Sequence, residues 1–189
     1  AAQDAQAMHG LDVEAEILAA LAQEITTEID QEILSSLRSL AGADAVYDQT
    51  LTTGAYHFVG DRHAVLAIMM NQQANLIAAR TRRGAANWAV VSPTVLTVLQ
   101  SATTSAFART TEGTYEAPTN VKFVGTLNGT MRIYVDTYYT DTEVGADVLL
   151  GYKGSTETDA AAFYCPYVPL MSSGVVMDPG TFEPVVSFM

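Results

Sequence analysis

Apolar residues recur at helical spacing over residues 12–41, the longest regular pattern in the chain. Asp12 can cap the start of a helix, Glu14 and Glu16 fill its first turn, and Gly42 stands just past its end. A helix of this length extends roughly 43 Å, whereas a compact chain of this size has a radius of gyration of about 16 Å. The pattern therefore predicts a spine helix about as long as the molecule is wide.

Two stripes run along the predicted spine helix. The apolar positions recur every four residues, so the stripe rotates around the axis and its two ends must be buried against different surroundings. Its members are Leu21, Ile25, Ile29, Ile33 and Leu37. On the other side lies an acidic ladder, Glu24, Glu28 and Glu32, whose like charges are mildly unfavourable on an isolated helix. The ladder is either a solvated face or a surface that docks onto basic side chains of a neighbouring subunit.

A second helical pattern covers residues 62–83 and is preceded by a polar connection, residues 44–61, with one expected short strand at 55–59. Its inward positions are Leu66, Met69, Met70 and Ile77. The helix ends in a basic cluster, Arg80, Arg82 and Arg83, before Gly84. Cationic side chains suit a helix C-terminus, so the cluster is either an ordinary helix end or a surface that pairs with acids of a partner.

The next elements are short. Residues 87–91 form an apolar strand pattern, and Ser92 with Pro93 then predicts the capped start of a helix that ends at Leu99. Residues 101–120 are rich in Thr, Ser, Gly and Ala, which favours a long exposed loop. Together these residues predict a strand-turn-helix unit followed by a mobile or interacting loop.

A β-hairpin is predicted at residues 121–136, where two strand patterns flank Asn128-Gly129, the favoured type I′ turn. A two-residue turn sets Phe123 opposite Tyr134 and Val124 opposite Ile133. Both faces of the hairpin carry enough apolar side chains that each face is expected to be at least half covered by other parts of the protein. Two further strands are expected at residues 148–152 and 163–171, and Pro166 and Pro169 make the second an edge strand.

The charge of the chain argues against some classes of function. The sequence has 189 residues, 49% of them apolar, and a net charge of −12. Residues 1–60 contain ten acids and a single base, Arg38. This balance argues against a dedicated nucleic-acid reader and against docking on an anionic membrane. Apolar runs stay far below the ~18 residues that a membrane span needs, no secretion signal is present, and the single Cys165 fits a reducing cytosol.

Candidate chemistry is sparse. His9, His57 and His63 lie in no metal-ligand motif; His57 and His63 can meet a metal together with Asp61, but a structural role is favoured. Cys165 is expected to be a buried, inert thiol. Residues 151–155 resemble a phosphate loop but lack its residue order, so a turn with a lysine is expected. The pattern predicts an α+β protein without catalytic, cofactor-binding or metal-binding residues, and with an interaction or structural role.

Several sequence blocks resemble the major capsid proteins of T-even-type tailed phages. The first are His9-Gly10-Leu11-Asp12 and Arg132-Ile133-Tyr134-Val135-Asp136. More specific are Gly151-Tyr152-Lys153-Gly154, Asp159-Ala160-Ala161-Ala162-Phe163-Tyr164, Pro166-Tyr167-Val168-Pro169-Leu170 and Asp178-Pro179-Gly180-Thr181-Phe182-Glu183-Pro184-Val185. These blocks keep the order and spacing of the family, and the resemblance covers nearly the whole chain.

The resemblance implies the Hong Kong 97-type capsid fold, an α+β fold in which a peripheral domain with a long spine helix joins an axial domain with a central mixed sheet. Residues 1–84 would then be peripheral, with helices at 12–41 and 62–83. Residues 85–171 would be axial, and residues 172–189 would return to the peripheral domain. Relative to the family, the chain corresponds to a central fragment without the N-terminal arm and extended loop, and alone it is expected to be a monomer or small oligomer.

The implied role is structural. The resemblance implies a virion protein, made in the host bacterial cytoplasm, whose partners are copies of itself in hexamers or pentamers, other head proteins and, at non-specific proximity, packaged double-stranded DNA. A vertex-type minor capsid protein of the same fold and a non-capsid binding module are the alternatives. The inter-subunit contact candidates are Glu24, Glu28, Glu32, Arg80, Arg82 and Arg83. An acidic ladder that lines the lumen would repel DNA, and charge reversal of the three arginines would block oligomers while the monomer stays folded.

Overall fold

The computed structural model describes residues 13–42, 45–48, 59–102, 107–109, 121–139, 147–167, 172–177, 179–180 and 184–188. The chain divides into two compact units. The larger unit is Gln23–Ala162, and the smaller one combines Ala1–Ala22 with Phe163–Met189. None of the helices in the described part of the chain is long and apolar enough to cross a membrane.

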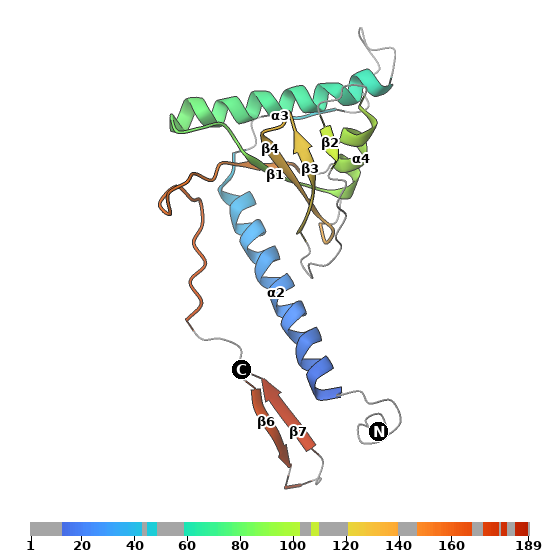
Figure 1. Ribbon diagram of the computed structural model, residues 1–189, viewed down its shortest axis with the longest axis vertical. Helices are drawn as coiled ribbons and strands as arrows, with labels where there is room; N and C mark the ends of the chain where they lie inside the picture. Colours follow the sequence, from blue (N-terminus) through green and yellow to red (C-terminus); the bar gives the residue numbers. More distant parts are fainter. Residues whose placement is uncertain are drawn as a thin grey trace. The chain divides into compact units, whose positions relative to one another are not determined.

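A five-stranded mixed sheet lies at the centre of the larger unit (Figure 1). Its strands run in the order β2-β3-β4-β1-β5. Their bounds are β1 Trp88–Val91, β2 Phe107–Arg109, β3 Val121–Leu127, β4 Met131–Asp136 and β5 Leu149–Gly151. Only β1 and β4 pair in parallel, and the other neighbours are antiparallel. The observed α+β architecture with a mixed sheet agrees with the sequence-based prediction.

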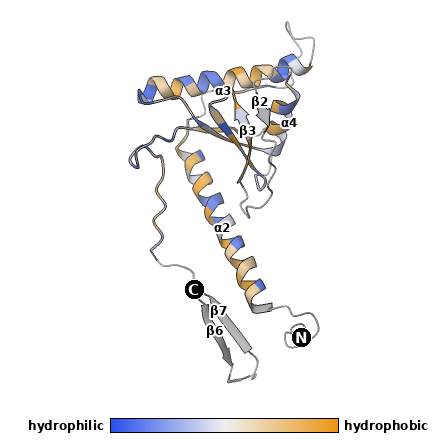
Figure 2. Cartoon of the chain, in the orientation of Figure 1, coloured by the Kyte–Doolittle hydropathy of each residue, from blue (hydrophilic) through white to orange (hydrophobic). Residues whose placement is uncertain are grey.

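Alternating side chains of the strands separate two apolar layers. On one face, Ile133 and Val91 join the main core with residues from α3 (Val59–Thr81) and α4 (Pro93–Ser101). On the other face, Val90 and Leu149 pack with Leu34 of α2 (Val13–Leu40). The sheet is therefore covered on both sides, by α3 and α4 on one face and by the C-terminal part of α2 on the other, and the apolar stripes of the helices are visible in Figure 2.

The helix predictions are confirmed in type and nearly in bounds. The spine helix α2 runs over Val13–Leu40, although Asp12 lies outside the described residues. α3 begins at Val59, three residues before the predicted start, so the last residue of the predicted strand at 55–59 is helical and the others lie outside the described residues. Ser92 caps α4 as expected, since its hydroxyl accepts a hydrogen bond from the Val95 amide.

The hairpin forms as predicted, but its register is only half right. Asn128 and Gly129 adopt the positive φ angles of a type I′ turn. Phe123 pairs with Tyr134 as predicted, whereas Ile133 pairs with Gly125 instead of Val124. The reason is that Leu127 pairs with Met131, so the loop holds three residues, Asn128, Gly129 and Thr130, instead of the predicted two. A bulge at Val124 then adds one residue to β3 and restores the expected register beyond it.

Two strand predictions need correction. The segment expected to be a loop, residues 101–120, contains β2, which pairs antiparallel with the edge of β3. Conversely, residues 163–167 of the predicted strand at 163–171 are irregular, and 168–171 lie outside the described residues. Pro166 lacks the amide hydrogen that a ladder requires, which weakens any pairing at that point.

The smaller unit contains a two-stranded antiparallel ribbon. Its strands are β6 (Ser172–Met177) and β7 (Pro184–Phe188). Their register shifts between Ser172 and Val175. The start of α2, residues 13–22, belongs to the same unit.

Replacing Gly151 by alanine is expected to lower the free energy of unfolding by about 2 kcal/mol, because overpacking a filled site costs energy. A Cβ at position 151 would lie 2.0 Å from the Trp88 ring, which packs across the glycine on the neighbouring strand. Gly129 is the matched control: its φ of +71° carries a cost of about 1 kcal/mol for alanine, but no atom lies within 4 Å of the new methyl group. Denaturation is followed by Trp88 fluorescence, and only Gly151→Ala should change the emission spectrum of the native protein. If the two alanine variants had the same native spectrum and lost the same free energy of unfolding, the packing of Trp88 across Gly151 would be contradicted.

Candidate functional site

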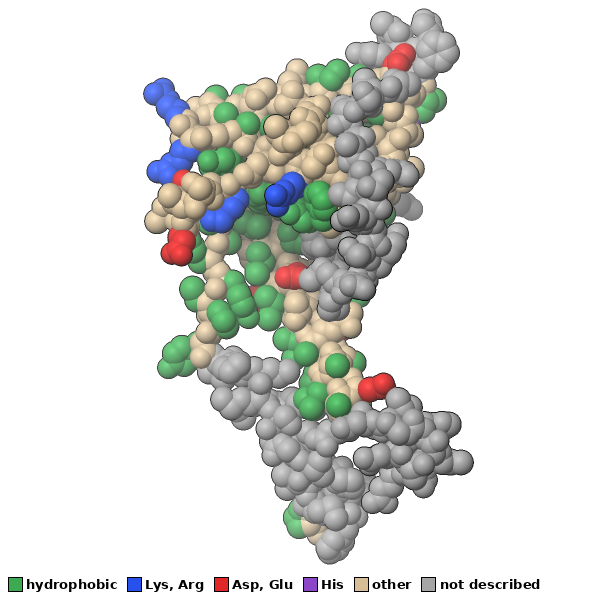
Figure 3. Space-filling model, in the orientation of Figure 1, with side chains coloured by type: hydrophobic (Ala, Val, Ile, Leu, Met, Phe, Trp, Pro, Cys, Tyr) green, Lys and Arg blue, Asp and Glu red, His purple; other side chains and the backbone are tan. Residues whose placement is uncertain are grey.

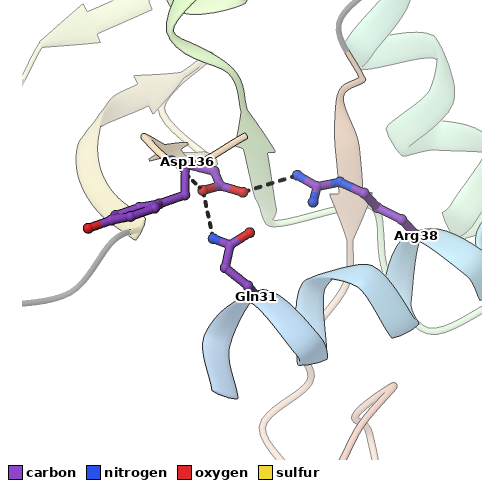
Figure 4. Close-up of polar contacts among 4 residues, drawn as sticks. Gln31, Arg38 and Asp136 are labelled. Carbon is purple, nitrogen blue, oxygen red and sulfur yellow. Dashed lines mark hydrogen bonds and ion pairs between the residues drawn. The ribbon is translucent and has the colours of Figure 1, made fainter. Parts of the chain in front are cut away.

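A buried polar network, here called the helix anchor, joins α2 to the end of β4 (Figure 4). Its centre is Asp136, which is fully buried. Gln31 donates through Nε2 to Oδ1 at 2.9 Å, and Arg38 donates through Nη2 to Oδ2 at 3.3 Å. The Tyr138 amide also donates to Oδ1, at 3.1 Å. Two side chains of α2 and one backbone amide just beyond β4 therefore donate to one buried carboxylate.

Arg38 is held on its other side by an aromatic ring. Its guanidinium carbon lies 4.4 Å from the centre of the Tyr139 ring, within cation–π range. Burial raises the pKa of Tyr139, and its hydrogen bond to the Asp147 carboxylate raises that pKa further. The phenol hence stays protonated as a donor. The Nε atom of Arg38 is buried without a hydrogen-bond partner in the described structure, so part of the guanidinium remains uncompensated.

The sequence offered one signal for the helix anchor. Arg38 is the only base among residues 1–60, which contain ten acids. Its partner Asp136 closes an apolar strand 98 residues later, where a charged side chain ends the alternation. The pairing itself could not be predicted, because it depends on which face of the sheet α2 covers.

The inter-subunit contact candidates lie on the surface of the larger unit. Glu24, Glu28 and Glu32 are all exposed along α2. The basic cluster lies at the end of α3, where blue atoms gather in Figure 3. Arg82 has a φ of 54°, in the left-handed region, and its amide donates to the Ala78 carbonyl to close the helix. The ladder and the cluster thus offer opposite charges on separate elements.

Arg83 has a partner within the chain: it pairs with Asp159. The Gly154 amide donates to the Asp159 carbonyl at 3.0 Å, and the Asn87 side chain both donates to and accepts from the Lys153 backbone. Residues 151–159 therefore form a turn fastened to the end of α3 and the start of β1, which confirms the structural interpretation of the sequence at Lys153.

The other reactive side chains are distributed singly. His63 is buried, and its Nδ1 lies 2.5 Å from the Ser101 hydroxyl, which itself donates to the Val98 carbonyl. Cys165 is exposed, so the prediction of a buried thiol is wrong: it lies in the irregular segment 163–167, whose side chains are all exposed. His9 and His57 lie outside the described residues. Within the described ranges, no three His, Cys, Asp or Glu side chains gather where a metal ion could bind.

The described residues can hold α2 in place against the sheet and can offer surfaces to other proteins. The helix anchor fixes the C-terminal part of α2 against the sheet at one defined position, since a hydrogen-bonded buried charge tolerates little displacement. The exposed surfaces carry separated charges and several exposed apolar side chains, among them Ile68, Leu76 and Tyr167. Such features are typical of a subunit that binds other proteins.

Comparison with known proteins places these features in one family. The sequence model of the family described as Major capsid protein Gp23 matches residues 1–189. The major capsid protein of Vibrio phage KVP40 is 33% identical over 99% of this chain and 39% of its own length. The major capsid protein of Enterobacteria phage T4 is 33% identical over 99% of this chain and 38% of its own length. The major capsid protein of Salmonella phage ViI is 33% identical over 89% of this chain and 39% of its own length. The chain spans about two fifths of the length of these curated relatives.

Proposed function

The chain belongs to the Gp23 family of major capsid proteins, and from this premise we propose that it is part of a structural subunit that assembles into hexameric or pentameric capsomers of an icosahedral phage head around double-stranded DNA. The observation that carries the proposal is the match of the family to the whole chain, residues 1–189. In this role the subunit sits in the virion with other head proteins and catalyses no reaction.

The architecture is compatible with the Hong Kong 97-type capsid fold, which we propose for the whole subunit. Residues 1–84, with the spine helix and α3, would supply a peripheral part. Residues 85–171, with all five strands of the mixed sheet, would form the axial domain, and residues 172–189 would return to the periphery. A shell gains stability from many repeated interfaces rather than from one strong site, which suits a chain whose chemistry is confined to packing and surface charge.

We also propose that the acidic ladder faces the lumen. Glu24, Glu28 and Glu32 are exposed, and a row of carboxylates repels the phosphate backbone of packaged DNA. DNA can then move during packaging without adhering to the shell. Density for DNA in direct, tight contact with these three glutamates would contradict this orientation.

The capsid role is tested by expressing the whole subunit with its head-assembly partners and examining the products by negative-stain microscopy and native mass spectrometry. We expect closed shells or capsomers of uniform size. Quantitative mass spectrometry of purified heads should find this chain as the most abundant protein, whereas a vertex protein would be present at a small fraction of that number. Monodisperse monomers under all assembly conditions would contradict the proposal.

Charge reversal in the basic cluster separates assembly from folding. Arg82→Glu is expected to reduce the yield of shells at least tenfold while the subunit stays folded, because the side chain is exposed and its role is proposed to lie at a subunit contact. Arg83→Glu is the control: its pair with Asp159 lies within the chain, and the Arg83 side chain is 61% exposed although that of Asp159 is only 14% exposed, so it should cost about 1 kcal/mol of stability and leave most of the shell yield. Sedimentation gives the assembly yield and circular dichroism the folded state; equal shell yields for the Arg82 variant and the unmodified subunit would argue against the contact.

A further inference from the structure

The outer face of α3 has no charge. Between Arg62 and Arg80, the helix contains no Asp, Glu, Lys or Arg. Its exposed stripe consists of Ile68, Asn71, Gln72, Asn75, Leu76 and Ala79. Ile68 is 56% exposed and Leu76 is 41% exposed. A solvated helix face normally carries charged side chains, so an amide-rich face with two aliphatic side chains is typical of a contact surface.

A second uncharged surface lies in the smaller unit. Residues 163–167, here called the aromatic strap, belong to a stretch without charge between Asp159 and Asp178. Phe163 is 68% exposed, Tyr164 61% and Tyr167 97%. The strap is neither helix nor strand, and its backbone makes no hydrogen bond with other residues that the structure describes. Aromatic side chains that each bury about 150–250 Å² when covered are left in solvent here.

We propose that the aromatic strap of one subunit docks on the α3 outer face of a second copy of the same chain. The inference rests on the proposed self-assembly and specifies one of its contacts. Each surface is exposed in the single chain, and each is neutral on a protein of net charge −12. A contact between two neutral surfaces avoids the repulsion that other pairings of this acidic surface incur.

The aromatic strap and the α3 outer face also match in length and in the hydrogen-bonding groups that they offer. The stripe from Ile68 to Ala79 spans about 16 Å along the helix, and five extended residues of the strap span about 16 Å. The amides of Asn71, Gln72 and Asn75 supply both donors and acceptors for the strap backbone, whose own hydrogen-bonding groups lack partners in the described structure. Ile68 and Leu76 supply apolar contacts for the aromatic rings.

Such a contact is heterologous, because two different surfaces of the same chain meet. Heterologous contacts close into rings when the rotation between copies allows it. Three aromatic side chains at about 150–250 Å² each can bury about 450–750 Å², which is a large part of the roughly 800 Å² that each partner contributes to a stable interface. Repetition of this contact around a ring therefore supplies a capsomer-forming interface.

The test uses Cys165, which lies within the strap and is the only cysteine of this chain. In assembled heads of the whole subunit, we expect its alkylation, followed on the peptide that contains it, to be at least tenfold slower than in unassembled subunits. In heads of the Leu76→Cys variant, a short bismaleimide should join positions 76 and 165 of different copies, as read from mixed isotope-labelled subunits. Ser35→Cys, at an exposed position of α2, is the control and should give no such product.

The outcomes separate this inference from the proposed function. Shells with fast-reacting Cys165, with no product joining 76 and 165, or with that product only inside one copy overturn the strap contact and leave the capsid role standing. Covalent products between copies in a small oligomer that never forms shells support the contact and contradict the capsid role. Protection of Cys165 by another head protein, without the product, also overturns the inference.

Discussion

Replacing Arg38 by alanine is expected to lower the free energy of unfolding by about 3 kcal/mol, because it leaves the buried carboxylate of Asp136 without its cationic partner. Asp136 is fully buried, and the Arg38 side chain is only 19% exposed. The loss falls at the lower end of the range for buried pairs because Gln31 and the Tyr138 amide still donate to the carboxylate. Urea or guanidinium denaturation of the protein measures the difference.

Two comparisons make the prediction specific. Arg132→Ala removes an exposed arginine from β4, the strand that ends at Asp136, and should change stability by no more than about 0.5 kcal/mol. The double variant Arg38→Met with Asp136→Leu should recover most of the loss, since replacing both charges removes the desolvation cost that either single change exposes. Equal losses for Arg38→Ala and Arg132→Ala would show that the helix anchor contributes nothing to the position of α2.

Replacing Ile133 by alanine is expected to cost about 4 kcal/mol, because it opens a cavity in the main core. Ile133 is fully buried at the centre of β4, where α3 and α4 cover the sheet. The surrounding layer contains two helices and two neighbouring strands, which cannot all move inward to fill the space. The change should therefore unfold a large fraction of the chain at 37 °C and abolish assembly.

Ile68→Ala is the matched control, since it removes the same atoms from a position on α3 that is 56% exposed. It should cost no more than about 0.5 kcal/mol in the unassembled subunit. Denaturant midpoints with unchanged slopes would attribute the difference to stability alone. A loss at Ile68 as large as that at Ile133 would contradict the assignment of these two residues to surface and core.

Local patterns predicted the local elements well. The long apolar and acidic stripes gave α2, the Ser92-Pro93 pair gave the start of α4, and Asn128-Gly129 gave the hairpin turn. Each of these signals acts within a few residues, where helix caps and turn geometry are decided. These predictions hold because the contacts that stabilise a helix start or a turn are made between residues close together in the sequence.

Features that depend on distant partners were missed. The short strand β2 exists because β3 offers it an edge, and Phe107–Arg109 alone has no strong strand pattern. The bulge at Val124 depends on where β4 begins after the turn. The helix anchor joins residues 98 positions apart, and only the isolation of Arg38 among acids hinted at a special role. The exposure of Cys165 does not follow from its apolar neighbours in sequence, because an apolar segment is buried only where another element covers it.

We propose that this chain forms part of a capsid subunit in which a long spine helix is fixed to a mixed sheet. Electron cryomicroscopy of assembled heads tests it most directly. We expect closed shells whose repeating unit shows one continuous helix of 28 residues, with density joining Arg38 and Asp136 at the five-stranded sheet. Shells in which this helix is broken or separated from the sheet in every copy, or heads from which the chain is absent, would contradict the account.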